Sequence, residues 1–185
     1  IAASGGCYVR SDPENGGSPI FRTGSLVVEQ GGVFSANRFG CWGAASKGVA
    51  GYGPGAGKAN ADNNNAGGAG GYGGRGANGA KAGGSTYGDA LRPLDPGSGG
   101  ASGYSGGENG GGLIRVEARR EVTIDGAVTA NGGGGSSQVG SGSGGGIYIR
   151  APKFYGADTG VIHANGGSNG PGGGGGRVAI WYGRV

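Results

Sequence analysis

The chain has 185 residues, of which 55 are glycine, and its net charge is +4 from 15 basic and 11 acidic residues. Glycine makes up about 30% of the chain against a usual share of roughly 7%, so a conventional core of large side chains must be thin. The small, dispersed positive charge excludes a typical nucleic-acid-binding protein. No apolar run approaches the ~18 residues that span a bilayer, so we expect no membrane insertion.

The apolar residues cluster in short β-branched and aromatic stretches, which predict strands. In chain order these are LVV at 26, LIRV at 113, IYI at 147 and VAIWY at 178. We expect one domain, 1–185, made of an N-terminal strand region (1–43), a glycine-rich region (44–112) and repeated strand units (113–185). Methionine is absent, even from position 1, so we expect a processed form or a segment of a longer protein.

The N-terminal region contains both cysteines of the chain, Cys7 and Cys41. A disulfide between them would close one loop and stabilise the fold by roughly 3 to 4 kcal/mol in an oxidising compartment. Two buried free thiols are the alternative. We expect the disulfide.

The glycines of the central region keep a period of three. They are Gly67, Gly70, Gly73, Gly76, Gly79, Gly97, Gly100, Gly103 and Gly106, with Asn109 breaking the phase before Gly112. Three residues per turn is the repeat of the polyproline II helix, which rises about 3.1 Å per residue and has no internal hydrogen bonds. A glycine edge would let two such helices approach until their backbones touch.

The segments between these runs, NADNNN at 60–65 and LRPLDP at 91–96, are rich in turn-forming residues. We therefore expect residues 44–112 to fold into an antiparallel bundle of polyproline II helices, in which the run 67–79 forms one rod about 40 Å long. Proline is too sparse for a collagen triple helix. The fold class expected is all-β or irregular, with almost no α-helix: short strands in a β-helix-like or sandwich-like core, combined with this bundle.

A second repeat surrounds the only histidine. The sequences GVFSAN, GAVTAN and GVIHAN end in Ala36-Asn37, Ala130-Asn131 and Ala164-Asn165. Strand alternation places Phe34, Val128 and Ile162 on the same face as the alanines, and Ser35, Thr129 and His163 on the other. His163 therefore fills a position that serine and threonine fill elsewhere, which favours a structural role over catalysis. Asparagine suits a turn after each strand.

Other chemistry finds little support in the sequence. Asp125 and Asp158 precede two copies of the repeat and could form a carboxylate pair, but Asp125 next to Gly126 is typical of a turn. Asp62 in NADNNN has oxygen-rich neighbours, yet the spacing of a calcium loop is missing. We expect no catalytic residue, no metal and no cofactor.

Four tyrosines, Tyr52, Tyr72, Tyr87 and Tyr104, project from the glycine runs. Aromatic side chains on a rigid scaffold can stack on sugars or on another subunit. They can equally cover the boundary between the glycine region and the strands. Both interpretations stay open.

The alternation of strand, Ala-Asn-Gly-Gly, glycine run and strand, as in VTANGGGG leading to GGGIYI, resembles the glycine-rich repeats of very large secreted or surface proteins of bacteria and protists. It is also similar in architecture to the glycine-rich extracellular region of the anaplastic lymphoma kinase family, whose strand motifs are not reproduced. The resemblance implies an extracellular or cell-surface location and a structural or adhesive role.

We expect a non-enzymatic structural protein that associates with itself, or with neighbouring modules of a larger chain, in a fibre, filament or matrix. A glycan-binding adhesion module is the alternative. Ice binding is a third, but charged side chains interrupt the flat face that it needs.

Overall fold

The computed structural model describes residues 1–59 and 66–183, and these residues form two parallel β-sheets with no helix. Sheet A contains, in spatial order, β1 (Gly6–Tyr8), β3 (Val33–Ser35), β5 (Ala127–Thr129) and β8 (Val161–His163). Sheet B contains β2 (Ile20–Val28), β4 (Leu113–Ile124), β6 (Gly146–Ala151) and β9 (Arg177–Tyr182), and β7 (Lys153–Tyr155) pairs with the far end of β4. The chain is all-β, as its composition predicts.

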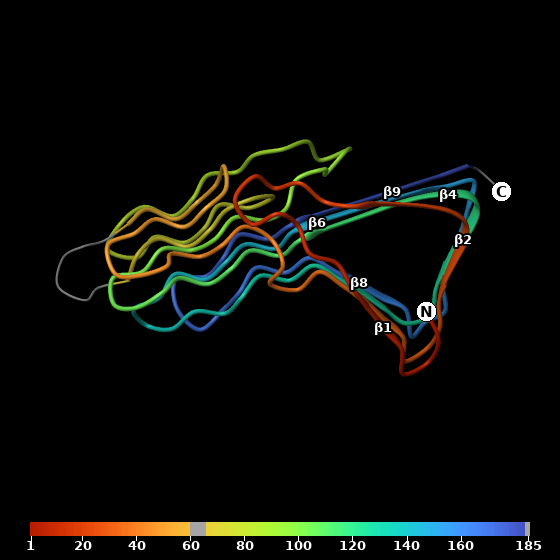
Figure 1. The fold of residues 1–185 in the computed structure, drawn as a ribbon, viewed down its shortest axis with the longest axis horizontal. Helices are drawn as coiled ribbons and strands as arrows, with labels where there is room; N and C mark the ends of the chain where they lie inside the picture. The colour runs from red at the N-terminus through yellow and green to blue at the C-terminus, as the bar shows by residue number, and fades with distance from the viewer. Residues whose placement is uncertain (60–65, 184–185) are drawn as a thin grey trace.

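The chain alternates between the two sheets. Strands β2 and β4 of sheet B lead through short turns to β3 and β5 of sheet A, and β6 leads through β7 to β8. Each strand of sheet A leads into a glycine-rich segment before the chain returns to sheet B. We call one such passage a repeat unit. The glycine-rich segments 9–19, 36–59 with 66–112, 130–145 and 164–176 form the glycine-rich half of the molecule, and the two sheets form the strand half (Figure 1). Strands from 1–43 and from 113–185 therefore lie in the same sheets.

Apolar side chains of successive units stack above one another between the sheets. Phe34 is in register with Val128, and Val128 with Ile162, along sheet A. Across the core, Ile114 and Ile149 of sheet B are fully buried. β-Branched residues fit such stacked parallel strands because each packs on its equivalent one strand away.

The long strand β4 bends halfway along sheet B. Arg119 and Arg120 are both exposed there, and the register between β2 and β4 shifts between Thr23 and Ser25. A bulge of this kind increases local curvature. The bend and the divergence of the sheets give the strand half a wedge shape that narrows toward the glycine-rich half (Figure 1).

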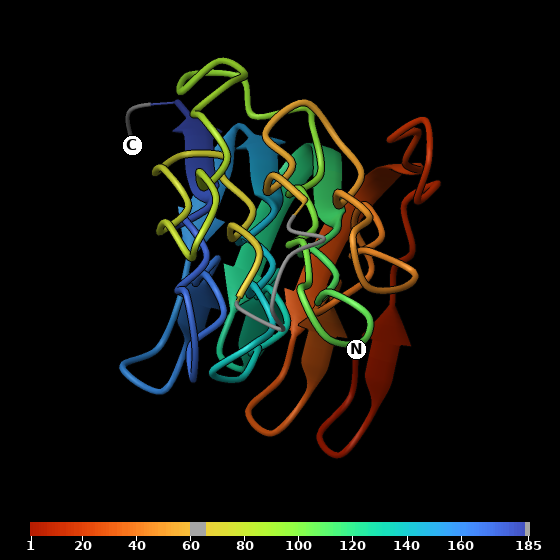
Figure 2. The ribbon, with the colours of Figure 1, turned by 90° about the vertical axis from the view of Figure 1, so that its left-hand side faces the viewer.

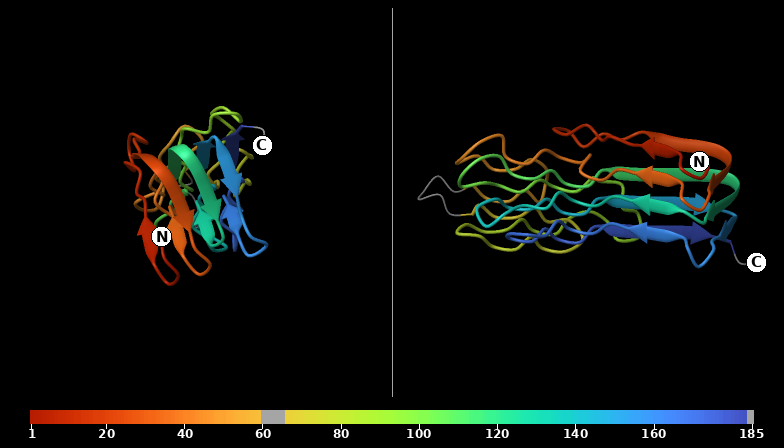
Figure 3. Two further views of the ribbon diagram at one scale, coloured as in Figure 1. Left: turned by 90° about the vertical axis from the view of Figure 1, so that its right-hand side faces the viewer. Right: turned by 90° about the horizontal axis from the view of Figure 1, so that it is seen from below.

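The glycine-rich half consists of extended segments that lie side by side, in front of the sheets in Figure 2 and beyond the ends of the strands in the right panel of Figure 3. Their backbone amides donate to neighbouring segments. The consecutive amides of Gly99, Gly100 and Ala101 donate to three different segments, at the carbonyls of Tyr52 (3.0 Å), Glu108 (2.9 Å) and Gly68 (2.8 Å). Because successive amides point in three directions, one extended segment can form hydrogen bonds with neighbouring segments on all of its sides.

The run 67–79 does not form the single rod that its phase predicts. It turns back at Tyr72–Gly74, so that the amide of Ala69 donates to Ala77 (3.1 Å) and that of Ala80 to Ala66 (2.8 Å). The run 97–112 turns in the same way, where the Ser102 hydroxyl accepts the amides of Tyr104 and Ser105, both at 3.0 Å. The expected 40 Å rod is therefore wrong, and each run is a hairpin of two short extended arms.

The phased glycines nevertheless lie where no side chain fits. For eight of the nine, all but Gly103, an added Cβ would lie 2.1 to 2.9 Å from backbone atoms of another segment. A second row, Gly68 and Gly71, is equally tight against 82–85, and the third position of the triplet holds the buried Ala69 and Tyr72. The first arm of this hairpin is thus enclosed by two bare edges and one edge of buried side chains.

Candidate assembly surface and binding groove

The asparagines of the Ala-Asn repeat form a ladder along sheet A. The Asn131 amide donates to the side-chain oxygen of Asn37 (2.7 Å), and the Asn165 amide donates to that of Asn131 (2.8 Å). The backbone ladder continues beside it, with Ala36 N–H donating to Thr129 (2.7 Å) and Ala130 N–H to His163 (2.8 Å). The sequence predicted a turn role for these asparagines. In the structure each carboxamide also joins one unit to the next.

The polar positions of the same strands are aligned. Ser35 pairs with Thr129, and Thr129 with His163, and the Thr129 hydroxyl donates to the Ser35 hydroxyl at 3.2 Å. Ser35 and Thr129 are buried, whereas His163 lies exposed on the terminal strand β8. His163 occupies the register position that the repeat assigns to it.

Both ends of the strand stack are open. At one end, β8 and β9 expose Val161 (38%), Val178 (42%) and Trp181 (46%). At the other, β1 and β2 expose Tyr8 and Ile20. Each of these four strands has a strand neighbour on one side only within the described part of the chain. Unpaired parallel edges of this kind can accept further strands.

Of the four tyrosines proposed as surface groups, one is buried and a second, Tyr87, is half-buried beside it. Tyr72 is fully buried and packs on Tyr87, with 4.7 Å between the ring centroids. The guanidinium of Arg177, the first residue of β9, lies 5.6 Å from the centre of the Tyr72 ring and donates to the carbonyl of Tyr87. Burial raises the pKa of both phenols. Tyr72 and Tyr87 therefore cover the boundary between the two halves, and the prediction that Tyr72 contacts a ligand at the surface is wrong.

The other two tyrosines are accessible. Tyr52 packs edge-to-face on Trp42, with 6.0 Å between the ring centroids, and Tyr104 is 61% exposed at the turn of the second hairpin. They lie on the glycine-rich half.

Both cysteines are free, so the predicted disulfide is not formed. Cys7 lies within β1, opposite Phe34, whereas Cys41 is buried in the glycine-rich half beside Gly53 and Ser98. The intervening chain passes through both sheets and places the two thiols in different halves. Burial, followed by the charges of Asp12 and Asp95, raises the pKa of the Cys41 thiol to about 11.

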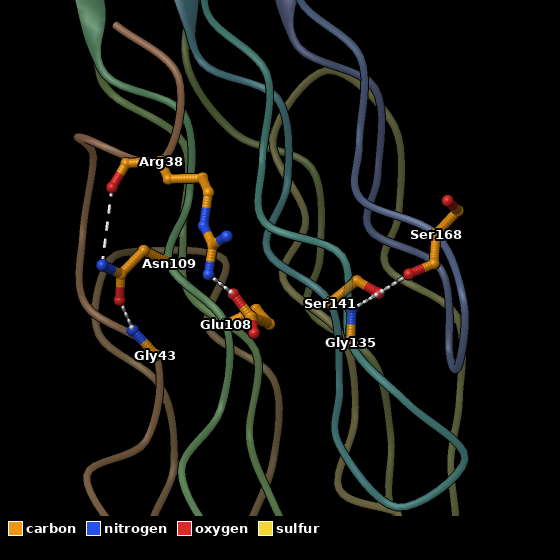
Figure 4. A network of polar contacts seen from close by, with 7 residues as sticks. All are labelled: Arg38, Gly43, Glu108, Asn109, Gly135, Ser141 and Ser168. Atoms are coloured by element: carbon orange, nitrogen blue, oxygen red, sulfur yellow. Dashed lines mark hydrogen bonds and ion pairs between the residues drawn. The ribbon is translucent and has the colours of Figure 1, made fainter.

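Polar side chains clip the glycine-rich segments together (Figure 4). Asn109, the residue that breaks the glycine phase, accepts the Gly43 amide (2.9 Å) and donates to the Arg38 carbonyl (3.4 Å). The adjacent Glu108 pairs with Arg38 at 2.6 Å. The Ser141 hydroxyl accepts the Gly135 amide and donates to the Ser168 carbonyl at 3.2 Å. The exception in the phase is therefore a cross-link between segments.

The structure also contains a groove that sequence reasoning missed. Its volume is about 800 Å³, it crosses all four long strands of sheet B on their outer face, and we call it the sheet B groove. Its main side chains are those of Arg22, Glu117, Arg119, Arg150, Trp181 and Tyr182. These residues are far apart in the sequence, and only the strand register brings them together.

One carboxylate in the sheet B groove is already paired. Glu117 accepts hydrogen bonds from Arg115 (2.5 Å) and Arg22 (3.2 Å). The hydrogen bond from Arg115, then that from Arg22, lowers the pKa of Glu117, so this carboxylate is ionised at neutral pH.

The remaining groups suggested by the sequence hold turns or lie elsewhere. The Asp125 carboxylate accepts the Ala157 amide (2.8 Å) and its carbonyl accepts the Thr159 hydroxyl (2.9 Å), while Asp158 is exposed. Asp62 and the rest of NADNNN fall outside the described residues. Across 1–59 and 66–183 no three His, Cys, Asp or Glu side chains gather as a metal site, and no helix there could cross a membrane.

Comparisons with protein-family models, with curated proteins and with solved structures gave no match to this chain.

Proposed function

We propose that this chain is a non-enzymatic structural module that stacks end to end with copies of itself, or with similar modules, in an extracellular or cell-surface fibre or matrix. In this proposal the strand half is a β-helix-like core and the glycine-rich half is a bundle of short polyproline II helices. The period of three, the bare glycine edges and the divergent amides of 99–101 support the second assignment.

The register between the two open ends is the observation that carries the proposal. Cys7 pairs with Phe34, which is in line with Val128 and Ile162, so β1 of a second copy placed beside β8 would set Cys7 on Ile162. Along sheet B, Phe21 is in line with Val116, Ile149 and Ile180. β2 of the same second copy would then place Phe21 on Ile180. Both sheets and the core would continue without a break.

The asparagine ladder also matches at this junction. Tyr8 pairs with Ser35, and the Val9 amide donates to the Ser35 carbonyl, which makes Arg10 the equivalent of Asn37. Within the described residues, the side-chain oxygen of Asn165 accepts no hydrogen bond and the Arg10 amide makes none. In the stacked arrangement this amide would donate to that oxygen, as Asn131 does to Asn37.

Sedimentation velocity over a range of concentrations, with negative-stain imaging, tests the proposal. We expect the native chain to form linear assemblies, and Val161→Lys on the edge strand β8 to raise the dissociation constant at least tenfold, because a lysine blocks strand addition. Val49→Lys is the matched control, since Val49 has the same exposure (38%) but lies in the glycine-rich half. A native chain that stays monomeric at millimolar concentration, or equal effects of the two variants, would contradict the proposal.

A further inference from the structure

The sheet B groove has a linear arrangement of functional groups. Arg22 is in register with Glu117, Glu117 with Arg150, and Arg150 with Trp181, so one side chain from each of four adjacent strands lies in a single row. At a strand spacing of about 4.8 Å the row is ~14 Å long. Ala118 and Ala151 border the groove and belong to the buried core beneath it. Such a groove fits an elongated ligand that runs across the strands.

The groove carries positive charge that the protein does not neutralise. Three arginines and one glutamate line it, and Glu117 is held by Arg22 and Arg115. Arg119 and Arg150 have no carboxylate partner anywhere in the described chain. A guanidinium binds carboxylates and sulfates with two parallel hydrogen bonds, so these two side chains favour an anionic ligand.

An aromatic wall closes one end of the row. The indole N–H of Trp181 donates to the Leu91 carbonyl at 2.8 Å, which fixes the ring while leaving 46% of the residue exposed. Tyr182, the next residue of β9, alternates to the other face and packs on Phe154, with 6.2 Å between the ring centroids, so Trp181 provides the aromatic face of the row. A fixed aromatic face offers apolar area at little entropic cost, and the C–H face of a sugar ring can pack on it.

We propose that the sheet B groove binds an acidic oligosaccharide, with Arg119 and Arg150 holding its carboxylate or sulfate groups and Trp181 stacking on a sugar ring. The length of the row and the aromatic side chain at its end favour this ligand over a small inorganic anion. A small anion would contact only one or two arginines and would leave the rest of the row unused. Single-stranded nucleic acid requires a charged track with successive stacking platforms. Here the row has one aromatic residue, Trp181, at one end, and the net charge of the whole chain is only +4.

Titration calorimetry with tetragalacturonate tests the proposal, at a protein concentration at which sedimentation shows a single species. We expect binding at least tenfold tighter than that of neutral maltotetraose, and weaker binding as salt is added, because exposed charges are screened. A sulfated tetrasaccharide distinguishes the two kinds of anionic group. An oligothymidylate of four nucleotides tests the competing ligand class.

Two variants locate the site. Arg150→Gln should weaken tetragalacturonate binding about tenfold, which corresponds to one charge-assisted contact of about 1.4 kcal/mol. Trp181→Ala should weaken it at least as much for every oligosaccharide that binds. Arg75→Gln removes an exposed charge in the glycine-rich half, and Trp42→Ala removes an indole of similar exposure (43%). Both controls should bind like the native chain.

Arg150 is exposed, so its substitution keeps the fold even if that of Trp181 loosens the contact with Leu91. Absence of binding to both acidic oligosaccharides would overturn the proposal, as would equal affinity for maltotetraose or for oligothymidylate. Equal losses with Arg150→Gln and Arg75→Gln would also overturn it. None of these outcomes depends on whether the chain assembles end to end.

Discussion

The two halves of this molecule exclude water in opposite ways. In the strand half, large apolar side chains such as Ile114 and Ile149 fill the space between two backbones. In the glycine-rich half the backbones themselves touch: a Cβ added to Gly99 would lie 1.9 Å from the Trp42 carbonyl oxygen, and one added to Gly142 would lie 1.9 Å from that of Asn109. One chain therefore specifies structure by the side chains it has and by the side chains it lacks.

The two modes differ in what stabilises them. Burial of apolar side chains contributes about 25 cal/mol per Å² and offsets the cost of ordering a strand. Glycine has no side chain to bury and loses more conformational freedom on ordering than any other residue. The glycine-rich half must therefore depend on its hydrogen bonds between segments and on the side-chain clips made by Asn109 and Ser141. Because facing backbones already touch there, a side chain added at these glycines would clash with the neighbouring segment.

The largest expected effect follows from that clash. Gly99→Ala should lower the free energy of unfolding by about 3 kcal/mol or more, because backbone on the facing segment would have to move. In the strand half, Ile149→Val should cost only about 1 kcal/mol. Denaturant unfolding followed by circular dichroism measures both.

Gly175→Ala is the matched control, because nothing lies within 4 Å of the Cβ it would add. We expect it to be neutral or slightly stabilising, since alanine restricts the unfolded chain. If Gly99→Ala and Gly175→Ala had the same effect, the glycines would matter for flexibility and not for close packing.

The rates at which the two cysteines react with a thiol reagent report how accessible each half is. Cys41 is 2% exposed and its thiol has a pKa raised to about 11, so at pH 8 it remains protonated and enclosed. Iodoacetamide should label Cys7 at least tenfold faster, with the site read by mass spectrometry. The rate at Cys41 should rise as the pH approaches 11.

The same shift has a consequence for stability. Above about pH 9 the unfolded thiol ionises while the folded one does not, so the contribution of Cys41 to folding is lost as the pH rises from about 9 to about 11. Labelling in denaturant should modify both cysteines without a reductant. If labelling needed a reductant, the two cysteines would be joined by the disulfide that is absent from the structure.

A smaller effect is expected at the ladder that borders both halves. Asn131→Ala leaves the Asn165 amide without its acceptor and should cost about 1 kcal/mol. Asn165→Ala removes a carboxamide that accepts nothing within the described chain, so it should leave the unfolding free energy unchanged while weakening end-to-end assembly. Equal stability losses would mean that these side chains act through their turns and not through the ladder.

The strand half was largely predictable from the sequence, because apolar clusters and an Ala-Asn repeat both report on register. Phe34, Val128 and Ile162 stack as the repeat predicts. The glycine phase identified residues that tolerate no side chain. It did not reveal the turns at Tyr72 and Ser102, because glycine permits an arm and a turn equally.

The sheet B groove could not be predicted for a different reason. Arg22, Glu117, Arg150 and Trp181 have no common motif, and each alone resembles an ordinary exposed residue of a strand. Their alignment depends on pairing registers set by the core residues between them.

Amide hydrogen exchange across the two halves tests most directly whether bare backbone packs as firmly as side chains do. The amides of Gly70, Gly99 and Gly100 donate to neighbouring segments at 2.9 to 3.0 Å. If bare backbone packs firmly, both halves open only when the whole domain unfolds. The protection factors of these glycine amides should then lie within about tenfold of those of the amides in β4 and β6. Exchange of these glycine amides at the rate of an unstructured chain, while the strands stay protected, would contradict the account.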